Sequence, residues 1–210
     1  MIANTNRKQA AKVLIGLAIF VQSMIFIYDT GKFYALTPEA LGKYFDIRWV
    51  LIAHIAGGAL ALATGPFLIW RRIREKSFRV HRYLGRTYAV SVLTAGAAAL
   101  YLSVTTGLQV NWMYSFSLVV LGTFWIIATL LAWRFVLKKK LALHEDWARR
   151  SYLLTIAFVA QATLMYHPFV IGLGSFADTS PTVIWASWSI PLFAFEIYLS
   201  SKNQKRGGRR

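Results

Sequence analysis

The chain has 210 residues, of which 57% are hydrophobic and 15% are charged, and its mean hydropathy is +0.47. These values exclude a disordered chain and most water-soluble folds. The sequence contains no Cys, which excludes disulfides, thiolate catalysis and zinc sites built from Cys. The 24 Lys and Arg residues outnumber the 8 Asp and Glu residues and give a net charge of +16, so the chain is both apolar and strongly basic.

Six apolar segments approach the length that a bilayer requires. A hydrocarbon core of about 30 Å needs about 20 apolar residues in a helix. The segments are residues 13–28, 47–70, 83–105, 115–137, 151–173 and 183–200. Because short connections join them, we expect a single integral membrane domain over residues 1–210, all-α with six transmembrane helices and a flexible basic tail at 201–210.

The basic residues predict how these helices are oriented. All but three of the 24 Lys and Arg residues flank the segment ends that would share one side of the membrane; the exceptions are Lys32, Lys43 and Arg48. Basic residues stay on the cytoplasmic side, so both termini are expected there. Seven of the eight Trp residues fall near the predicted boundaries, where indole rings are favoured. The pattern fits a bacterial cytoplasmic (inner) membrane.

The positive charge predicts membrane lipids, rather than nucleic acid, as partners. It lies in short loops beside apolar segments, where membrane topology and attraction to anionic lipid account for it. Nucleic-acid binding is therefore not expected. The sequence leaves open whether the chain forms a homo-oligomer or pairs with another membrane protein.

Two stretches of the sequence have similar layouts. Residues 81–88 read HRYLGRTY and residues 144–152 read HEDWARRSY. Each joins one apolar segment to the next, and the spacing from His to Tyr differs by one residue. This weak repeat predicts a pseudo-symmetric four-helix core made of the second to fifth segments, with the first and last helices outside it.

These two stretches and HIAGGALALATGPF at residues 54–67 resemble the bacterial membrane-protein family catalogued as domain of unknown function 2306. The family-like core spans residues 47–173. The matching positions are His54, Gly58, Gly65, Pro66, His81, Gly85, Arg86, Tyr88, His144, Trp147, Arg150, Ser151 and Tyr152. The chain departs from the family pattern at Leu68, at Ala148 and at Gln161 or Ala162. The resemblance implies a membrane fold and location, and it supplies no reaction.

The four histidines sort into two pairs by predicted depth. His54 and His167 fall at a similar depth near the outer leaflet, where we expect them to meet, and His81 and His144 lie at the cytoplasmic boundary. Paired imidazoles are the axial ligands of b-type haem, so all four are candidate haem ligands. His144 and His167 are about 35 Å apart along one helix, which argues against two buried haems. In the alternative interpretation, the cytoplasmic pair hydrogen-bonds backbone or lipid phosphate.

Arginine and tyrosine side chains form a candidate anion site on the cytoplasmic face. Arg recognises phosphate and carboxylate through two parallel hydrogen bonds. The predicted ligand is an anionic headgroup or a metabolite, and the alternative is that these side chains reach into ordinary lipid. The residues are Arg86, Tyr88, Arg149, Arg150 and Tyr152.

A pair of opposite charges lies within the apolar segments. Arg134 and Glu196 fall late in the fourth and last segments, at a similar inner depth. Charged groups within a membrane are costly and pair with one another. We therefore predict an Arg134–Glu196 ion pair, acting as a structural clamp or as part of a proton relay.

The sequence contains none of the common catalytic signatures. It has no Walker loop, GxGxxG, GxSxG, hydrolytic triad or metal-binding motif, so an enzyme is less expected than a non-enzymatic protein. Three functions stay open. They are lipid or small-ligand binding or a conduit, electron transfer through b-type haem, and a small proton-coupled carrier that uses His54, His167 and the Arg134–Glu196 pair.

Overall fold

The computed structural model describes the backbone of residues 2–207, and the side chains in that range except those of 2–13, 15, 71, 72, 203 and 205–207. Every regular element in the described range is helical. The elements are α1 (Ile2–Thr30), η1 (Gly31–Ala35), α2 (Pro38–Leu41), η2 (Gly42–Ile47), α3 (Arg48–Ile69), α4 (Arg71–Lys76), α5 (Phe78–Leu102), η3 (Ser103–Gly107), α6 (Trp112–Leu137), α7 (Leu141–Met165), α8 (Pro168–Ile171) and α9 (Phe176–Gly207).

Four helical segments within the described residues are long and apolar enough to cross a membrane. They are Pro38–Ile69, Phe78–Gly107, Trp112–Leu137 and Phe176–Lys202. These segments contain the second, third, fourth and sixth predicted spans. The helix at the predicted fifth span ends earlier than residue 173, because α7 (Leu141–Met165) stops at Met165 and Pro168 disfavours a helical conformation just before it. Membrane crossing by α1 and α7 stays a prediction.

Short polar residues set where several helices begin. Ser77 Oγ accepts a hydrogen bond from Val80 N at 3.3 Å and separates α4 from α5. Asn111 Oδ1 accepts one from Tyr114 N at 2.7 Å at the start of α6. These side chains satisfy backbone N–H groups that have no partner within their own helix. The breaks therefore follow from side-chain chemistry at the ends of apolar runs.

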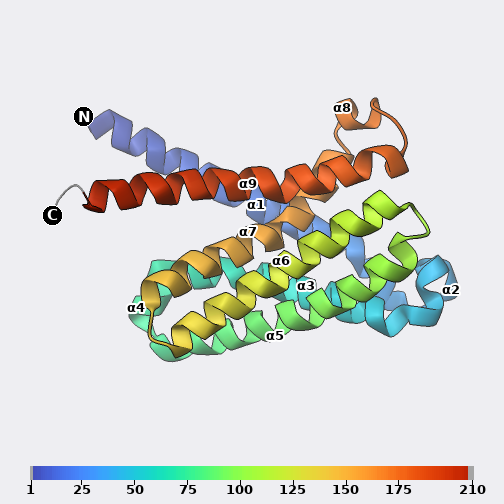
Figure 1. Cartoon of the computed structure of the whole chain (residues 1–210), viewed down its shortest axis with the longest axis horizontal. Helices are drawn as coiled ribbons and strands as arrows, with labels where there is room; N and C mark the ends of the chain where they lie inside the picture. The colour runs from blue at the N-terminus through green and yellow to red at the C-terminus, as the bar shows by residue number, and fades with distance from the viewer. Residues whose placement is uncertain (1, 208–210) are drawn as a thin grey trace.

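The four helices of the expected core form a closed ring. α3 packs on α5, α5 on α6, α6 on α7 and α7 on α3, while α9 packs on α6 and α7 and α1 packs on α3 and α7. Figure 1 shows α1 and α9 along one side of this ring, with the beginning of α1 and the end of α9 near the end that carries α4. The symmetry between its halves stays a prediction. α9 is helical through Gly207, and residues 208–210 of the predicted tail lie outside the described residues.

The centre of the ring is closely packed. Trp125 is only 1% exposed and packs among Val92, Leu154 and Ile184. α3 and α5 approach closely at Gly57, where a Cβ would lie 2.8 Å from Ser91 O. Small residues at helix contacts allow such an approach. The dense centre separates two ends that differ in chemistry.

Candidate functional site

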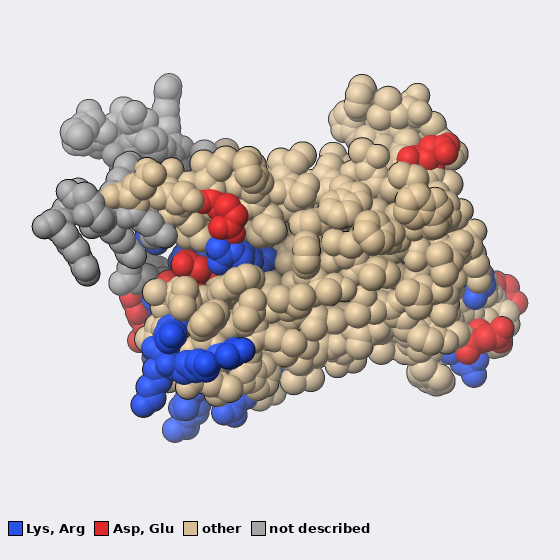
Figure 2. All heavy atoms as spheres, viewed as in Figure 1, with Lys and Arg blue, Asp and Glu red and all other residues tan. Residues whose placement is uncertain are grey.

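Charged side chains distinguish the two ends of the bundle. We call the end formed by residues 71–86 and 134–150 the basic end, and the opposite end, which carries α2, η3 and α8, the cavity end. Figure 2 shows Lys and Arg side chains gathered where α4 and α5 meet, with a surface of uncharged residues between the two ends. The predicted site residues divide between these ends.

Arg150 and Glu196 connect α7 to α9 near the basic end. Arg150 Nε donates to Glu196 Oε1 at 2.6 Å, and Arg150 Nη2 donates to Oε2 at 2.9 Å. The guanidinium also lies over the rings of Trp147 and Phe195, at 4.7 and 5.6 Å from their centroids. Two parallel bonds and two aromatic faces fix the Arg150 side chain in one orientation.

The predicted Arg134–Glu196 pair is wrong. Glu196 binds Arg150, whereas Arg134 is exposed and has no ionic partner among the described side chains. Both arginines lie toward the basic end, so a depth estimate from the sequence could not choose between them. The choice depends on how α6 and α7 are rotated about their axes.

A second ionic cluster at the basic end is centred on Glu145. Arg74 of α4 donates to Glu145 Oε1, and Arg149 lies 3.4 Å from the other oxygen of Glu145 and 3.5 Å from Asp146. The hydrogen bond from Arg74 lowers the pKa of the Glu145 carboxyl because it stabilises the charged form. Arg149 therefore has carboxylate partners within the protein, which weakens its predicted role as an anion ligand.

Tyr88 lies in a buried network of hydroxyl groups and not in a surface anion site. Its Oη lies 2.8 Å from both Ser151 Oγ and Thr155 Oγ1. Trp125 Nε1 donates to Thr155 Oγ1 at 2.8 Å, and Thr129 Oγ1 lies 2.7 Å from Ser151 Oγ. Buried polar groups need such partners, so the network joins α5, α6 and α7 at the centre of the bundle.

The Tyr152 side chain also packs within the bundle. Its ring covers Gly65 of α3 so closely that a Cβ at this glycine would overlap it. The five residues predicted to form one anion site are therefore divided. Arg149 and Arg150 bind carboxylates, Tyr88 and Tyr152 pack inside the bundle, and Arg86 remains exposed.

His81 and His144, both predicted to lie at the cytoplasmic boundary, share the basic end of the bundle. His144 Nδ1 donates to Ala132 O at 2.9 Å, and His81 lies near His144, Arg74 and Glu145. His81 Nδ1 is buried without a hydrogen-bond partner. Ligation of haem by His81 and His144 stays a prediction.

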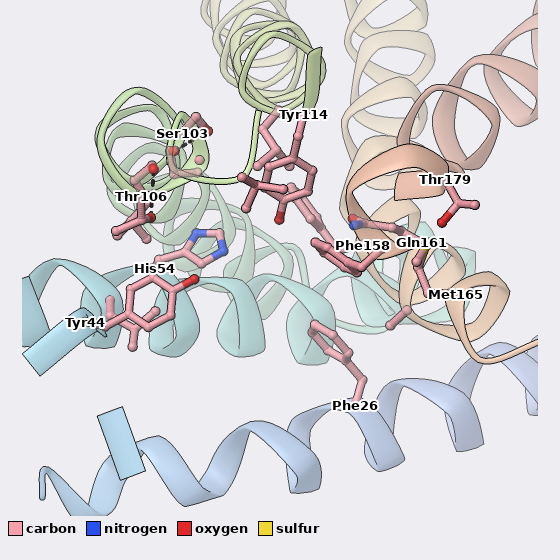
Figure 3. A pocket seen from close by; sticks show the side chains of 18 of the residues that line it. Phe26, Tyr44, His54, Ser103, Thr106, Tyr114, Phe158, Gln161, Met165 and Thr179 are labelled. Carbon is pink, nitrogen blue, oxygen red and sulfur yellow. Dashed lines mark hydrogen bonds between the residues drawn. The ribbon is translucent and has the colours of Figure 1, made fainter. Parts of the chain in front are cut away.

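A cavity of about 680 Å³ occupies the cavity end, between α1, α3, α5, η3, α6, α7 and the start of α9. Most of its wall is aliphatic and aromatic. Its lining side chains include Phe26, Tyr44, Leu51, His54, Ser103, Thr106, Tyr114, Phe158, Gln161, Met165, Tyr166 and Thr179. Figure 3 shows the hydroxyls of Tyr44 and Tyr114 directed toward the space beside the His54 ring.

His54 lines this cavity, and a hydrogen bond to the backbone determines which nitrogen of the neutral ring carries the proton. Its Nδ1 lies 3.0 Å from Ala95 O. A carbonyl oxygen can only accept, so Nδ1 carries the proton in the neutral ring and Nε2 has a free lone pair. The ring of Phe158 meets the imidazole edge at 6.1 Å between centroids. His54 therefore offers one oriented acceptor to a ligand.

His167 does not join His54. It follows the end of α7, is exposed, and caps α8, where its Nδ1 accepts from Phe169 N at 3.3 Å. The cavity is lined by Tyr166 and Val170, on either side of His167, and not by His167 itself. The expected meeting of these two histidines near the outer leaflet is wrong, because Pro168 ends the long helix before His167.

Sequence reasoning missed Tyr44 and Tyr114 as cavity residues. Tyr44 lies in η2, a short 3-10 helix outside the predicted spans, and Tyr114 directly precedes the predicted fourth span. Two sequence signals do point to this cavity. They are His54, a histidine inside an apolar segment, and Gln161, at one of the two positions where the family pattern carries Arg.

The fold and the two ends define an all-helical membrane protein with a cavity at one end and a cationic surface at the other. The chain belongs to the DUF2306 family, whose model, described as "Predicted membrane protein (DUF2306)", matches residues 51–199. The resemblance stated from the three motifs is thus confirmed. No curated protein and no solved structure matches the chain.

Proposed function

We propose that the protein is a non-enzymatic binding protein for a hydroxyl-bearing, otherwise apolar molecule of the membrane. The cavity at the cavity end is its binding site. The observation that carries this proposal is the contact between His54 Nδ1 and Ala95 O, which leaves Nε2 of the neutral ring as an acceptor in an otherwise largely apolar cavity. An acceptor in such surroundings favours a ligand that brings a donor, because a buried polar atom without a partner is costly.

The size and walls of the cavity support a small amphipathic ligand. Its volume of about 680 Å³ lies in the range of roughly 300–1,000 Å³ that is typical of small-molecule sites. Phe26, Phe158 and Met165 supply apolar wall, while Tyr44 and Tyr114 supply hydroxyls beside the imidazole. Such a site holds an apolar body and orients one polar group.

The test uses a photoreactive probe of known chemistry. A long-chain alkanol that carries a diazirine is compared with its methyl ether, which has the same chain but no donor. We expect the alkanol to label peptides of the cavity wall more strongly than the ether does. His54→Phe, which keeps a ring but removes the acceptor, should abolish this preference.

The matched control is His167→Phe, which changes the exposed histidine outside the cavity and should leave the preference unchanged. Equal labelling by alkanol and ether in the unmodified protein would contradict the proposal. So would an unchanged preference in His54→Phe. Mass spectrometry of the labelled peptides supplies the readout.

The haem alternative now depends on the basic end alone. His54 and His167 do not face one another, whereas His81 and His144 share an end of the bundle. A visible spectrum of the purified protein tests this alternative. A Soret band that disappears in His144→Ala would favour haem binding. A colourless folded protein would contradict the haem alternative.

A further inference from the structure

A row of arginines at the start of α5 remains without a partner. Arg79, Arg82 and Arg86 are exposed and make no ion pair with any described carboxylate. Their spacing of three and four residues places them on one face of the helix. With Tyr83 they line a hollow of about 270 Å³. We call these four residues the arginine face.

Three other arginines at the same end pair with carboxylates. Arg74 and Arg149 bind Glu145, and Arg150 binds Glu196. The arginine face differs from these arginines in placing three guanidinium groups, none of them in an ion pair among the described side chains, around one hollow. Arg79 also lies in the first turn of α5, where the helix dipole adds partial positive charge.

We propose that the arginine face binds the phosphate headgroup of an anionic phospholipid. Guanidinium groups bind phosphate oxygens through two parallel hydrogen bonds. Three such groups around one hollow match a phosphodiester better than they match a neutral or zwitterionic headgroup. Basic pockets beside membrane helices bind anionic headgroups in this way.

The neighbouring apolar side chains favour a lipid over a free phosphate ion. Tyr83 is 72% exposed, and Phe78 and Val80 are also exposed beside the arginines. Arg82 lies over the Phe78 ring at 5.1 Å from its centroid. α5 begins one of the segments long enough to span a membrane. An acyl chain would follow this apolar surface while its phosphate meets the guanidinium groups.

The experiment compares two triple variants that remove equal charge from the same end. R79Q/R82Q/R86Q alters the arginine face, and K138Q/K139Q/K140Q alters the exposed turn between α6 and α7. Native mass spectrometry of the detergent-solubilised protein measures binding of phosphatidylglycerol and of phosphatidylcholine. We expect the arginine variant to lose about tenfold or more in phosphatidylglycerol affinity, and the lysine variant to lose less than about threefold.

Equal losses in the two variants would overturn the proposal, because net charge alone would then explain the attraction. If millimolar inorganic phosphate displaced phosphatidylglycerol, the proposal that the ligand is a lipid would be overturned. A preference for phosphatidylglycerol that persists in the arginine variant would overturn the assigned site. Because these side chains are exposed, the variants should fold, and R82Q alone, with a smaller loss, provides a second measurement. Failure of the cavity proposal leaves this result unaffected.

Discussion

Arg150 and Glu196 bind each other through two hydrogen bonds that join α7 to α9. The guanidinium lies against the rings of Trp147 and Phe195, so the pair is supported by packing as well as by charge. α9 contacts only α6 and α7 extensively. This pair is therefore a principal polar link between the last helix and the four-helix ring.

Replacing Glu196 by Gln should loosen this link. The variant keeps the size of the side chain but removes the charge that Arg150 binds, and we expect a loss of about 1–3 kcal/mol in the free energy of unfolding. Thermal unfolding in detergent measures the change. Arg134→Gln is the control, because Arg134 has no ionic partner among the described side chains. Equal destabilisation by the two variants would contradict the observed pairing.

Gly57 should tolerate no side chain. Gly57→Ala places a Cβ 2.8 Å from Ser91 O and 2.9 Å from the Ala95 side chain, which forces α3 and α5 apart and should cost about 2 kcal/mol or more. The neighbouring Gly58→Ala is the matched control, because nothing lies within 4 Å of its Cβ. Stability against denaturing detergent should fall in the first variant and stay unchanged or rise in the second. A similar stability for both would argue against the close approach.

Thr155→Val should destabilise the protein by disrupting the buried hydroxyl network. Thr155 Oγ1 contacts Tyr88 and Trp125, and it donates to Ser151 O at 3.0 Å. Removing it leaves the buried indole N–H without a partner, which costs about 1–3 kcal/mol. Thr163→Val, also in α7, should have little effect because its hydroxyl bonds only Val159 O. Tryptophan fluorescence during unfolding compares the two variants.

Acidification should weaken the Arg74–Glu145 bond. Arg74 lowers the pKa of Glu145 in the folded protein, so the stabilisation is present above the carboxyl's unfolded pKa and is lost as pH falls through the lower folded value. Because Glu145 is partly exposed, the contribution is about 0.5–1 kcal/mol. Glu145→Gln should therefore be less stable at pH 7, and its difference from the unmodified protein should shrink below about pH 4. A constant difference from pH 7 to pH 3.5 would contradict this assignment.

The predicted orientation can be tested by labelling single cysteines, since the chain has no Cys of its own. Lys139→Cys lies at the basic end and Asp178→Cys lies at the start of α9. A membrane-impermeant maleimide should label the second in intact cells and the first only after permeabilisation, because the basic end is expected in the cytoplasm. The reverse pattern would contradict the orientation.

The sequence predicted the helices better than it predicted their contacts. Long apolar runs located the helical segments because a membrane helix must satisfy all of its backbone hydrogen bonds internally. The end of α7 was missed, since Pro168 stops the helix inside an apolar stretch. The partner of Glu196 was missed because the rotation of a helix depends on packing, which the apolar pattern leaves unspecified in a chain that is apolar on nearly every face.

The candidate site was predictable only in part. His54 was identified because a histidine inside an apolar segment is costly and is expected to face the bundle. Its partner Ala95 O is a backbone atom, which carries no sequence signal. Tyr44 and Tyr114 reach the cavity from positions outside the predicted spans, and their placement follows from how η2 packs on α3 and how α6 packs on α5 and α7.

The buried hydroxyl network lies between the cavity and the basic end of the bundle. Trp125 and Thr155 are each 1% exposed and Ser151 is fully buried, so packed side chains close the middle of the ring between the two ends. A molecule bound beside His54, as we propose, would therefore find no open path through the bundle to the basic end, and it would leave through the side of the bundle where α1, η2 and α8 line the cavity.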